Sequence, residues 1–282
     1  MRLQTFFDYL SDFEFFIKIT LACVVFQWFF FYVLSGIELT LFSKIVIYWL
    51  VNVASYYIIA FLIEKVIKKN KKIARSRNTR NAQIKSQPYQ RASFKRFLLN
   101  QLQLFVVAAG VILLLHEVER EVNFFWNSAW FFMSIVITDF AFYAHHNWFL
   151  HHRRFIKIHA KHHSYRDTSG FVTGYKSFSD LVINFVLADM VVLILFGFDF
   201  YQLLAWTVVL NLFNIEGHSA ISLFFIGSDF HDRHHTHYRG NYGVQGLWDK
   251  IFGTFISTNR KTGLFFPANT LGHYLIAKQK TN

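Results

Sequence analysis

The stretch FFIKITLACVVFQWFFFYVLSG, residues 15–36, decides the class of fold, because Lys18 is its only charged residue. A helix of that length and apolar character is long enough to cross the hydrocarbon core of a bilayer. The whole chain agrees, with 54% hydrophobic residues, 20% aromatic residues, two prolines and a mean hydropathy of +0.28. Such a composition is typical of membrane proteins, so we predict an integral membrane protein. The alternative is a soluble enzyme with a large core.

Further apolar runs predict an all-α polytopic bundle of about four to six membrane helices. The expected spans are residues 15–36, 43–64, 97–115 and 125–144, followed by a hairpin of 180–197 and 201–217. We expect three regions: N-terminal transmembrane helices over 1–124, a catalytic region over 125–260 and a tail over 261–282.

The net charge of +12 is concentrated in residues 65–96, which contain no acidic residue. Beside apolar spans, such a basic loop predicts a cytoplasmic location and contact with anionic lipid. No nucleic-acid-binding motif accompanies it, so we do not expect a nucleic-acid partner. Alternating the spans from this loop brings all histidines between residues 145 and 237 to the cytoplasmic face, as a histidine-rich helical cap. The single cysteine, Cys23, lies in an apolar run and allows no disulfide framework.

All but two of the 14 histidines lie between residues 145 and 237, the exceptions being His116 and His273. The pattern H-x-x-H-H occurs twice within this region, as HAKHH from His159 and as HDRHH from His231. On a helix, residues three and four apart share a face, so each triplet could present its imidazoles together. Neutral imidazole is a ligand for iron, zinc and copper. A single zinc ion takes about four ligands. The larger number of histidines in this region therefore predicts two metal ions close together.

The two histidine doublets upstream, 145–146 and 151–152, are harder to interpret. His146 and His151 are five residues apart, about 140° around an α-helix, so they could converge only across a cavity or where the helix frays. His145 and His152 are seven apart and share a face. Spacing therefore leaves open which member of each doublet binds metal. Nearby acids could orient the imidazole N–H groups; they are Asp139, Glu216, Asp232 and Asp249.

At these residues the chain resembles the fatty acid hydroxylase/sterol desaturase superfamily of membrane di-iron enzymes. Three stretches carry the resemblance: DFAFYAHHNWFLHHRRFIKIHAKHHSYRD from Asp139, EGHS around His218, and FHDRHHTHYRGNYGVQGLWDKIFGT from Phe230. The resemblance implies a di-iron centre with nine ligands: His146, His151, His159, His162, His163, His218, His231, His234 and His235. His145, His152 and His237 could substitute for one of them or support them, and Asn241, Tyr242, Trp248, Asp249 and Gly253 match the family's C-terminal signature.

The same resemblance implies O₂-dependent hydroxylation or desaturation of a lipid such as a sterol or fatty acyl chain. Two iron ions would be the cofactor, O₂ the co-substrate, and a separate cytochrome b5, ferredoxin or reductase the electron donor. Two other classes compete with this hypothesis. A metal transport or storage protein should carry ionisable residues along its spans, and these are few. A zinc-dependent membrane hydrolase should carry H-E-x-x-H or G-x-S-x-G, and the chain contains neither.

Overall fold

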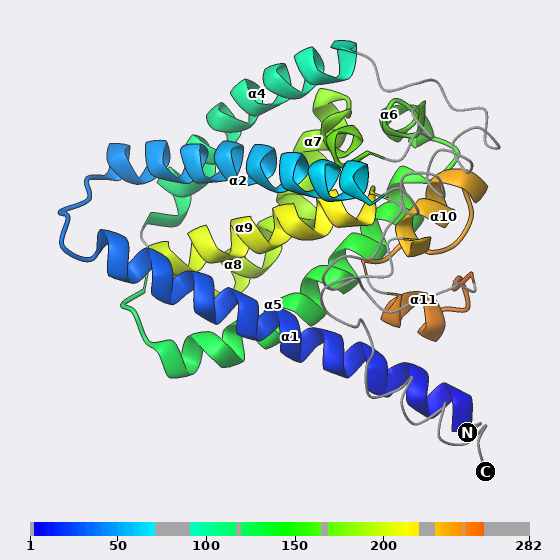
Figure 1. The fold of residues 1–282 in the computed structure, drawn as a ribbon, viewed down its shortest axis with the longest axis horizontal. Helices are drawn as coiled ribbons and strands as arrows, with labels where there is room; N and C mark the ends of the chain where they lie inside the picture. The colour runs from blue at the N-terminus through cyan, green and yellow to red at the C-terminus, as the bar shows by residue number, and fades with distance from the viewer. Residues whose placement is uncertain are drawn as a thin grey trace.

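The computed structural model describes residues 3–70, 91–116, 120–164, 169–219, 229–244 and 246–256. Over these ranges the chain consists of helices and their connections (Figure 1), which confirms the predicted all-α class. Most of the basic loop and the whole tail over 261–282 lie outside the described residues.

The long helices form the bundle, and short ones form a cap at one end of it (Figure 1). The bundle helices are α1 (Leu3–Leu34), α2 (Leu41–Lys69), α4 (Arg91–Leu115), α5 (Phe124–Ala144) with the π-helix His145–Leu150, α7 (Phe178–Asn184) with the π-helix Phe185–Asp189, α8 (Val191–Phe196) and α9 (Phe200–Gly217). The short ones are α6 (Ile156–His159), the 3₁₀ turns His162–Ser164 and Gly170–Gly174, α10 (Asp229–His237) and α11 (Leu247–Ile251).

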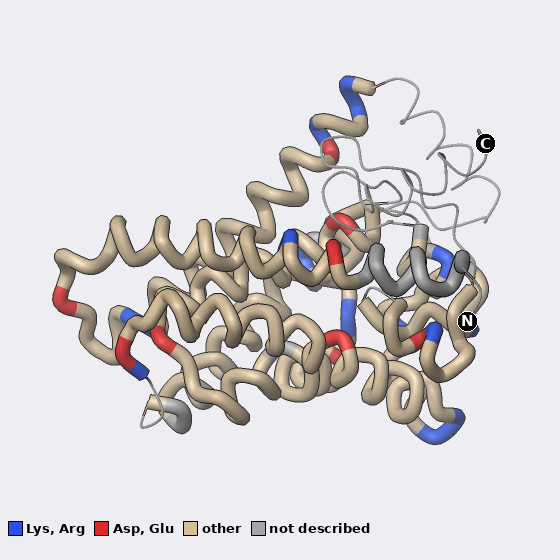
Figure 2. Tube along the Cα trace, turned by 90° about the horizontal axis from the view of Figure 1, so that it is seen from below, with Lys and Arg blue, Asp and Glu red and all other residues tan. Residues whose placement is uncertain are grey.

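Within the described ranges, four segments are long and apolar enough to cross a membrane, namely Phe13–Leu34, Leu41–Lys69, Phe124–Leu150 and Phe178–Phe196. Their outward faces expose large apolar side chains to the surroundings, among them Val25 on α1 and Phe61 on α2. Figure 2 shows long stretches of the trace without charged residues, and residues 19–34 of α1 and 45–63 of α2 contain none. An apolar, uncharged belt of this kind suits lipid, and the chain is an integral multi-pass membrane protein.

Two of the expected spans, 97–115 and 201–217, are helical but are not among these four segments. The apolar part of α4 that the structure describes, Leu98–Gly110, is shorter than a span. Helix α9 is instead the central helix, because it packs against α1 and α2 and buries side chains all around its axis. Its exclusion from the lipid-facing surface explains why polar residues are tolerated along it.

The N-terminus of α9 is fixed by the buried carboxylate of Asp199. This carboxylate caps the helix by accepting a hydrogen bond from the backbone N–H of Gln202 at 2.8 Å. It also accepts hydrogen bonds from the side-chain amides of Gln27 on α1 and Asn127 on α5. Three helices are thereby tied together at the end of the bundle opposite the cap (Figure 1).

The other end of α9 meets the basic end of α2. Ile63 and Ile67 of α2 pack against the buried Ile215 of α9, three residues before His218. Lys65, Lys68 and Lys69 therefore lie at the end of the bundle that carries the histidines, as alternation of the spans predicts (Figure 1). Which side of the membrane this end faces stays a prediction.

Candidate metal centre

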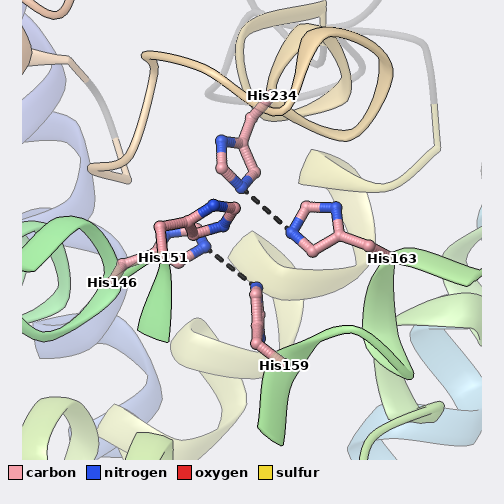
Figure 3. Close-up of side chains that lie close together, drawn as sticks. All are labelled: His146, His151, His159, His163 and His234. Atoms are coloured by element: carbon pink, nitrogen blue, oxygen red, sulfur yellow. Dashed lines mark hydrogen bonds between the residues drawn. The ribbon is translucent and has the colours of Figure 1, made fainter. Parts of the chain in front are cut away.

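Nine buried or half-buried histidines lie in two adjacent groups at the cap end of the bundle. The first group is His146, His151, His159, His163 and His234, and the second is His162, His218, His231 and His235; within each, one ring nitrogen per residue lies within 4.8 Å of all the others. Figure 3 shows the five imidazoles of the first group pointing toward one another. Rings of the two groups are in contact, with His163 and His235 having centroids 4.5 Å apart. These are the nine residues that the resemblance implies.

Each H-x-x-H-H triplet contributes to both groups. In the first triplet, His159 and His163 join the first group and His162 joins the second. In the triplet on α10 the assignment is reversed, since His231 and His235 join the second group and His234 joins the first. In both cases the two outer histidines stay together and the middle one crosses over. The two triplets therefore lie between the same two groups and hold them side by side.

The first triplet does not lie on one continuous helix, which corrects the expectation from spacing. Helix α6 ends at His159, and His162 and His163 lie in a separate 3₁₀ turn. The second triplet does lie on a single helix, α10. The imidazoles of the first triplet lie close together in spite of this break, and Asp180 of α7 holds the ring of His159 in place.

His146 and His151 converge because a π-helix joins them. The N–H of His151 donates to the carbonyl of His146 at 3.0 Å, an i→i+5 hydrogen bond. A π-helix has one more residue in the turn than an α-helix, so the residue five positions on comes back above the first. The two ring centroids are 5.0 Å apart. The expected 140° separation assumed α-helical geometry, and that assumption is wrong here.

The remaining histidines near the site contact other groups. Both ring nitrogens of His145 are engaged, Nδ1 with the carbonyl of Ala141 at 2.7 Å and Nε2 with the side-chain oxygen of Asn184 at 3.0 Å. His152 is exposed, and its Nδ1 accepts the backbone N–H of Arg154. His237 is exposed as well, with Nδ1 on the carbonyl of its own helix at Arg233. Within the described part of the chain, none of the three belongs to either group.

Backbone carbonyls fix the tautomer of three of the grouped histidines. Nδ1 of His146 lies 2.8 Å from the carbonyl of Tyr242, that of His234 lies 2.9 Å from the carbonyl of Gly240, and that of His218 lies 2.6 Å from a carbonyl on α9. A carbonyl can only accept, so each Nδ1 carries the proton. In a neutral imidazole the other nitrogen then has a lone pair and no proton. Nε2 of these residues is therefore the atom presented to the group.

The Nε2 atoms within each group face one another at short distances. Nε2 of His146 lies 3.1 Å from Nε2 of His159, whose own Nδ1 donates to a carboxylate, and Nε2 of His218 lies 3.2 Å from those of His162 and His235. Nε2 of His146 and Nε2 of His159 each carry a lone pair, and two lone pairs at that distance repel each other unless a cation lies between them. Two nitrogens bound about 2.1 Å from one metal ion, at right angles, would be about 3.0 Å apart. The arrangement therefore fits metal ions bound within each group.

Burial keeps these imidazoles in the neutral state that binds metal. It lowers the pKa of His162, His163 and His234 well below the ordinary value of 6.5, with the neighbouring imidazoles adding to the effect. Burial likewise lowers the pKa of His151 and His218 to about 3. Metal ligands must be deprotonated to bind, so at neutral pH these lone pairs are available.

The carboxylate that supports the site, Asp180, is absent from the sequence-based expectations. It is fully buried on α7, and both its oxygens lie within 3.1 Å of Nδ1 of His159. Ser177 caps α7 by accepting the backbone N–H of Asp180, which fixes the start of that helix. An ionisable residue inside an apolar segment is the signal that could have identified it.

Two of the four expected acids contact the loop after α10. Asp249 accepts the backbone N–H groups of Tyr242 and Gly243 at 2.8 Å, and Asp139 accepts that of Val244 at 2.7 Å. Asp249 therefore supports His146 indirectly, by holding the carbonyl of Tyr242 in position. Glu216 is buried on α9, and the side chain of Asp232 lies outside the described part of the structure.

A cavity of about 60 Å³ opens beside both groups. Histidines of each group line it together with apolar side chains from α5 and α9, including Phe142, Leu210 and Phe213. An apolar wall next to converging imidazoles can admit a hydrocarbon segment to a metal centre.

Comparison with known proteins gives consistent matches over this region. The family model for fatty acid hydroxylase matches residues 131–254. Fatty acid hydroxylase domain-containing protein 2 of Macaca fascicularis is 30% identical over 131 residues, which cover 44% of this chain and 39% of that protein. A putative methylsterol monooxygenase of Dictyostelium discoideum is 34% identical over 132 residues, covering 43% and 49%. Methylsterol monooxygenase 1 of Danio rerio is 32% identical over 143 residues, covering 46% and 47%. No solved structure matches the chain.

Fold and site together define an α-helical, multi-pass membrane protein with two neighbouring histidine groups suited to metal. Residues 131–254 contain all nine of these histidines and match the fatty acid hydroxylase family model, and this match supports the predicted resemblance to the fatty acid hydroxylase/sterol desaturase superfamily. The matched part of the chain spans less than half the length of each of these three relatives.

Proposed function

We propose that this protein is a membrane-bound di-iron oxidoreductase that hydroxylates or desaturates a lipid with O₂. The observation that carries the proposal is the pair of histidine groups whose ring nitrogens face one another beside an apolar cavity. The printed names of the relatives, a fatty acid hydroxylase domain protein and methylsterol monooxygenases, support a lipid substrate.

Five histidines would hold one iron ion and four the other, each through a ring nitrogen. Bound iron would supply the capacity to reduce O₂ and to break an unactivated C–H bond, which side chains alone cannot do. The chain itself contributes position and protection. Carbonyls hold His146, His218 and His234 in one tautomer and one orientation. Asp180 does the same for His159, as supporting groups do around metal ligands generally.

The apolar cavity places the substrate. Thr138, Phe142 and Phe213 border it on the side of the membrane helices, and His146 and His218 border it on the side of the two groups. A hydrocarbon segment held there would keep water away from the reacting carbon. A substrate lying in the bilayer could enter along the uncharged middle of the bundle.

The electrons would come from a separate donor protein such as cytochrome b5, a ferredoxin or a reductase. We place the histidine groups on the cytoplasmic side, because the basic end of α2 lies at the same end of the bundle and the sequence stays basic and free of acidic residues up to residue 96. The same positive charge would attract an acidic donor or anionic lipid.

Metal analysis of the purified protein, combined with lipid profiling of cells with and without it, tests the proposal. We expect two iron ions per chain and a lipid that differs by one oxygen atom or two hydrogen atoms. His162→Ala and His234→Ala remove one histidine from each group and should each abolish turnover. The exposed His152 provides the matched control, and His152→Ala should retain iron and activity. One zinc ion per chain with O₂-independent activity would refute the proposal.

A further inference from the structure

A second cavity, of about 90 Å³, lies inside the bundle between α2, α4, α7 and α9. Its lining is polar for a site within membrane helices. Six side-chain amides contribute to it, namely those of Asn52, Asn100, Gln101, Asn184, Asn211 and Asn214. Polar groups are costly at such depth and commonly mark a binding site or pathway.

This cavity adjoins the one beside the histidines. Lys176, Asn184, Leu210 and Asn214 line both cavities. Leu210, Asn214 and His218 succeed one another at four-residue intervals on α9, which places each about 6 Å further along the helix. A ligand that occupies the second cavity and extends past these residues therefore reaches the second histidine group.

Three buried polar atoms on the lining have no hydrogen-bond partner among the residues that the structure describes. They are Oδ1 of Asn100, Oε1 of Gln101 and Nε1 of Trp206, on residues that are 1%, 7% and 1% exposed. The amide nitrogen of Asn100 donates to the carbonyls of Gly174 at 3.0 Å and Lys176 at 3.3 Å. Since carbonyls only accept, the orientation of this amide is fixed and its oxygen remains available. Buried polar groups in native proteins are normally hydrogen-bonded, so these three atoms can form hydrogen bonds with a ligand in the cavity.

The chemistry of these atoms selects the kind of partner. Two are acceptors and one is an N–H donor. A hydroxyl group both donates and accepts, and so it can pair with either kind. A carboxylate only accepts and would leave both amide oxygens unpaired, although Lys176 could attract it. Water can also donate and accept, but it would not distinguish among lipids.

We propose that the second cavity binds the hydroxyl group of a neutral lipid alcohol, whose hydrocarbon part extends to the histidine groups. This inference rests on the proposed lipid oxidation and narrows its substrate class. Gln101 and Trp206 are then specificity-determining residues: they determine which lipid binds, and they do not contribute to metal binding.

Equilibrium binding to the full-length, iron-containing protein in nanodiscs tests the inference. The probes are a sterol and a long-chain primary alcohol, the methyl ether of each, and the fatty acid of the same chain length. We expect one of the two alcohols to bind at least about 10-fold more tightly than its ether, because a site that hydrogen-bonds a hydroxyl rejects the analogue that cannot donate. We expect the fatty acid to bind more weakly than that alcohol. If neither alcohol is preferred, the cavity holds water only and the inference fails; a preferred fatty acid also overturns it.

Two variants test whether Gln101 and Trp206 cause the preference for the alcohol, and a third variant serves as a control. Gln101→Leu and Trp206→Phe should each reduce the preference for the alcohol to within about threefold, while iron content stays at the wild-type level. Gln103 lies on the same helix and its Oε1 is also buried without a partner, but it does not line the cavity. Gln103→Leu should therefore keep the full preference. A preference that survives both Gln101→Leu and Trp206→Phe would place the hydroxyl elsewhere and overturn the inference. Iron content and O₂-dependent lipid oxidation report on the proposed function separately, so the two can fail independently.

Discussion

Replacement of Asp180 by asparagine tests whether a single buried carboxylate maintains the first histidine group. The two side chains have nearly the same shape, so the change removes charge and one acceptor without leaving a cavity. In the wild type, Asp180 accepts the Nδ1–H of His159 at 3.0 Å and the side-chain amide of Asn184 at 2.6 Å. The asparagine has one oxygen for two donors, and its own NH₂ group must face one of them.

The magnitude follows from the hydrogen bond that is lost. A hydrogen bond to a charged group contributes about 1.5–3 kcal/mol, which corresponds to roughly 10- to 150-fold in an equilibrium constant. Loss of a residue that supports a metal-binding histidine generally lowers metal affinity or activity about 10- to 100-fold. We therefore expect Asp180→Asn to weaken iron binding to the first group by 10- to 100-fold and to leave the second group loaded.

Competition with an iron chelator, followed by metal analysis, measures this change. The chelator concentration that removes half of the first iron should fall by the same factor, and the variant should retain about one iron per chain over a range in which the wild type retains two. Asp199→Asn is the matched control, because Asp199 is equally buried and hydrogen-bonded but lies at the opposite end of the bundle. Wild-type iron retention in Asp180→Asn, under conditions where His234→Ala loses iron, would refute the reasoning.

Three further changes have defined outcomes. Gly240→Ala should destabilise the fold, because Gly240 has φ +66° and an added Cβ would overlap the carbonyl oxygen of Thr254. It should also lower iron retention, because the carbonyl of Gly240 holds His234. Thermal unfolding and metal content measure the two effects, and unchanged values would contradict the structure. Asp249→Ala removes the acceptor of two backbone N–H groups and should cost about 1–3 kcal/mol of unfolding free energy, measured by denaturant titration. Burial lowers the pKa of His218 from 6.5 to about 3, so between these pH values the unfolded chain binds a proton that the folded chain does not. The unfolding free energy of the metal-free protein should therefore fall as the pH is lowered from 6.5 to about 3. An unfolding free energy that does not change with pH over this range would contradict the lowered pKa.

Much of the fold class could be predicted from the sequence, because its evidence is local. An apolar run such as residues 15–36 must be shielded from water whatever surrounds it, and helix is the structure that satisfies its backbone within one segment. The nine grouped histidines were identified in the same way, from their clustering, the repeated H-x-x-H-H spacing and the family resemblance. The predicted spans at 97–115 and 201–217 are not among the four candidate membrane segments of the described residues, and sequence alone does not reveal this because an apolar helix inside a bundle resembles one that faces lipid.

The tertiary structure decided which histidines converge and what holds them. Spacing could not separate His146 from His145, because the choice depends on the π-helix and on a side chain 39 residues away, at Asn184, that engages His145. Nor could it assign the middle histidine of each triplet to the opposite group, since that depends on how the two triplets approach each other. Asp180 and the polar cavity are likewise products of packing between α2, α4, α7 and α9. The chain's sequence carries residue types and local periodicity, whereas a metal site and a substrate pocket need atoms from distant segments at fixed distances, and only the folded bundle provides those.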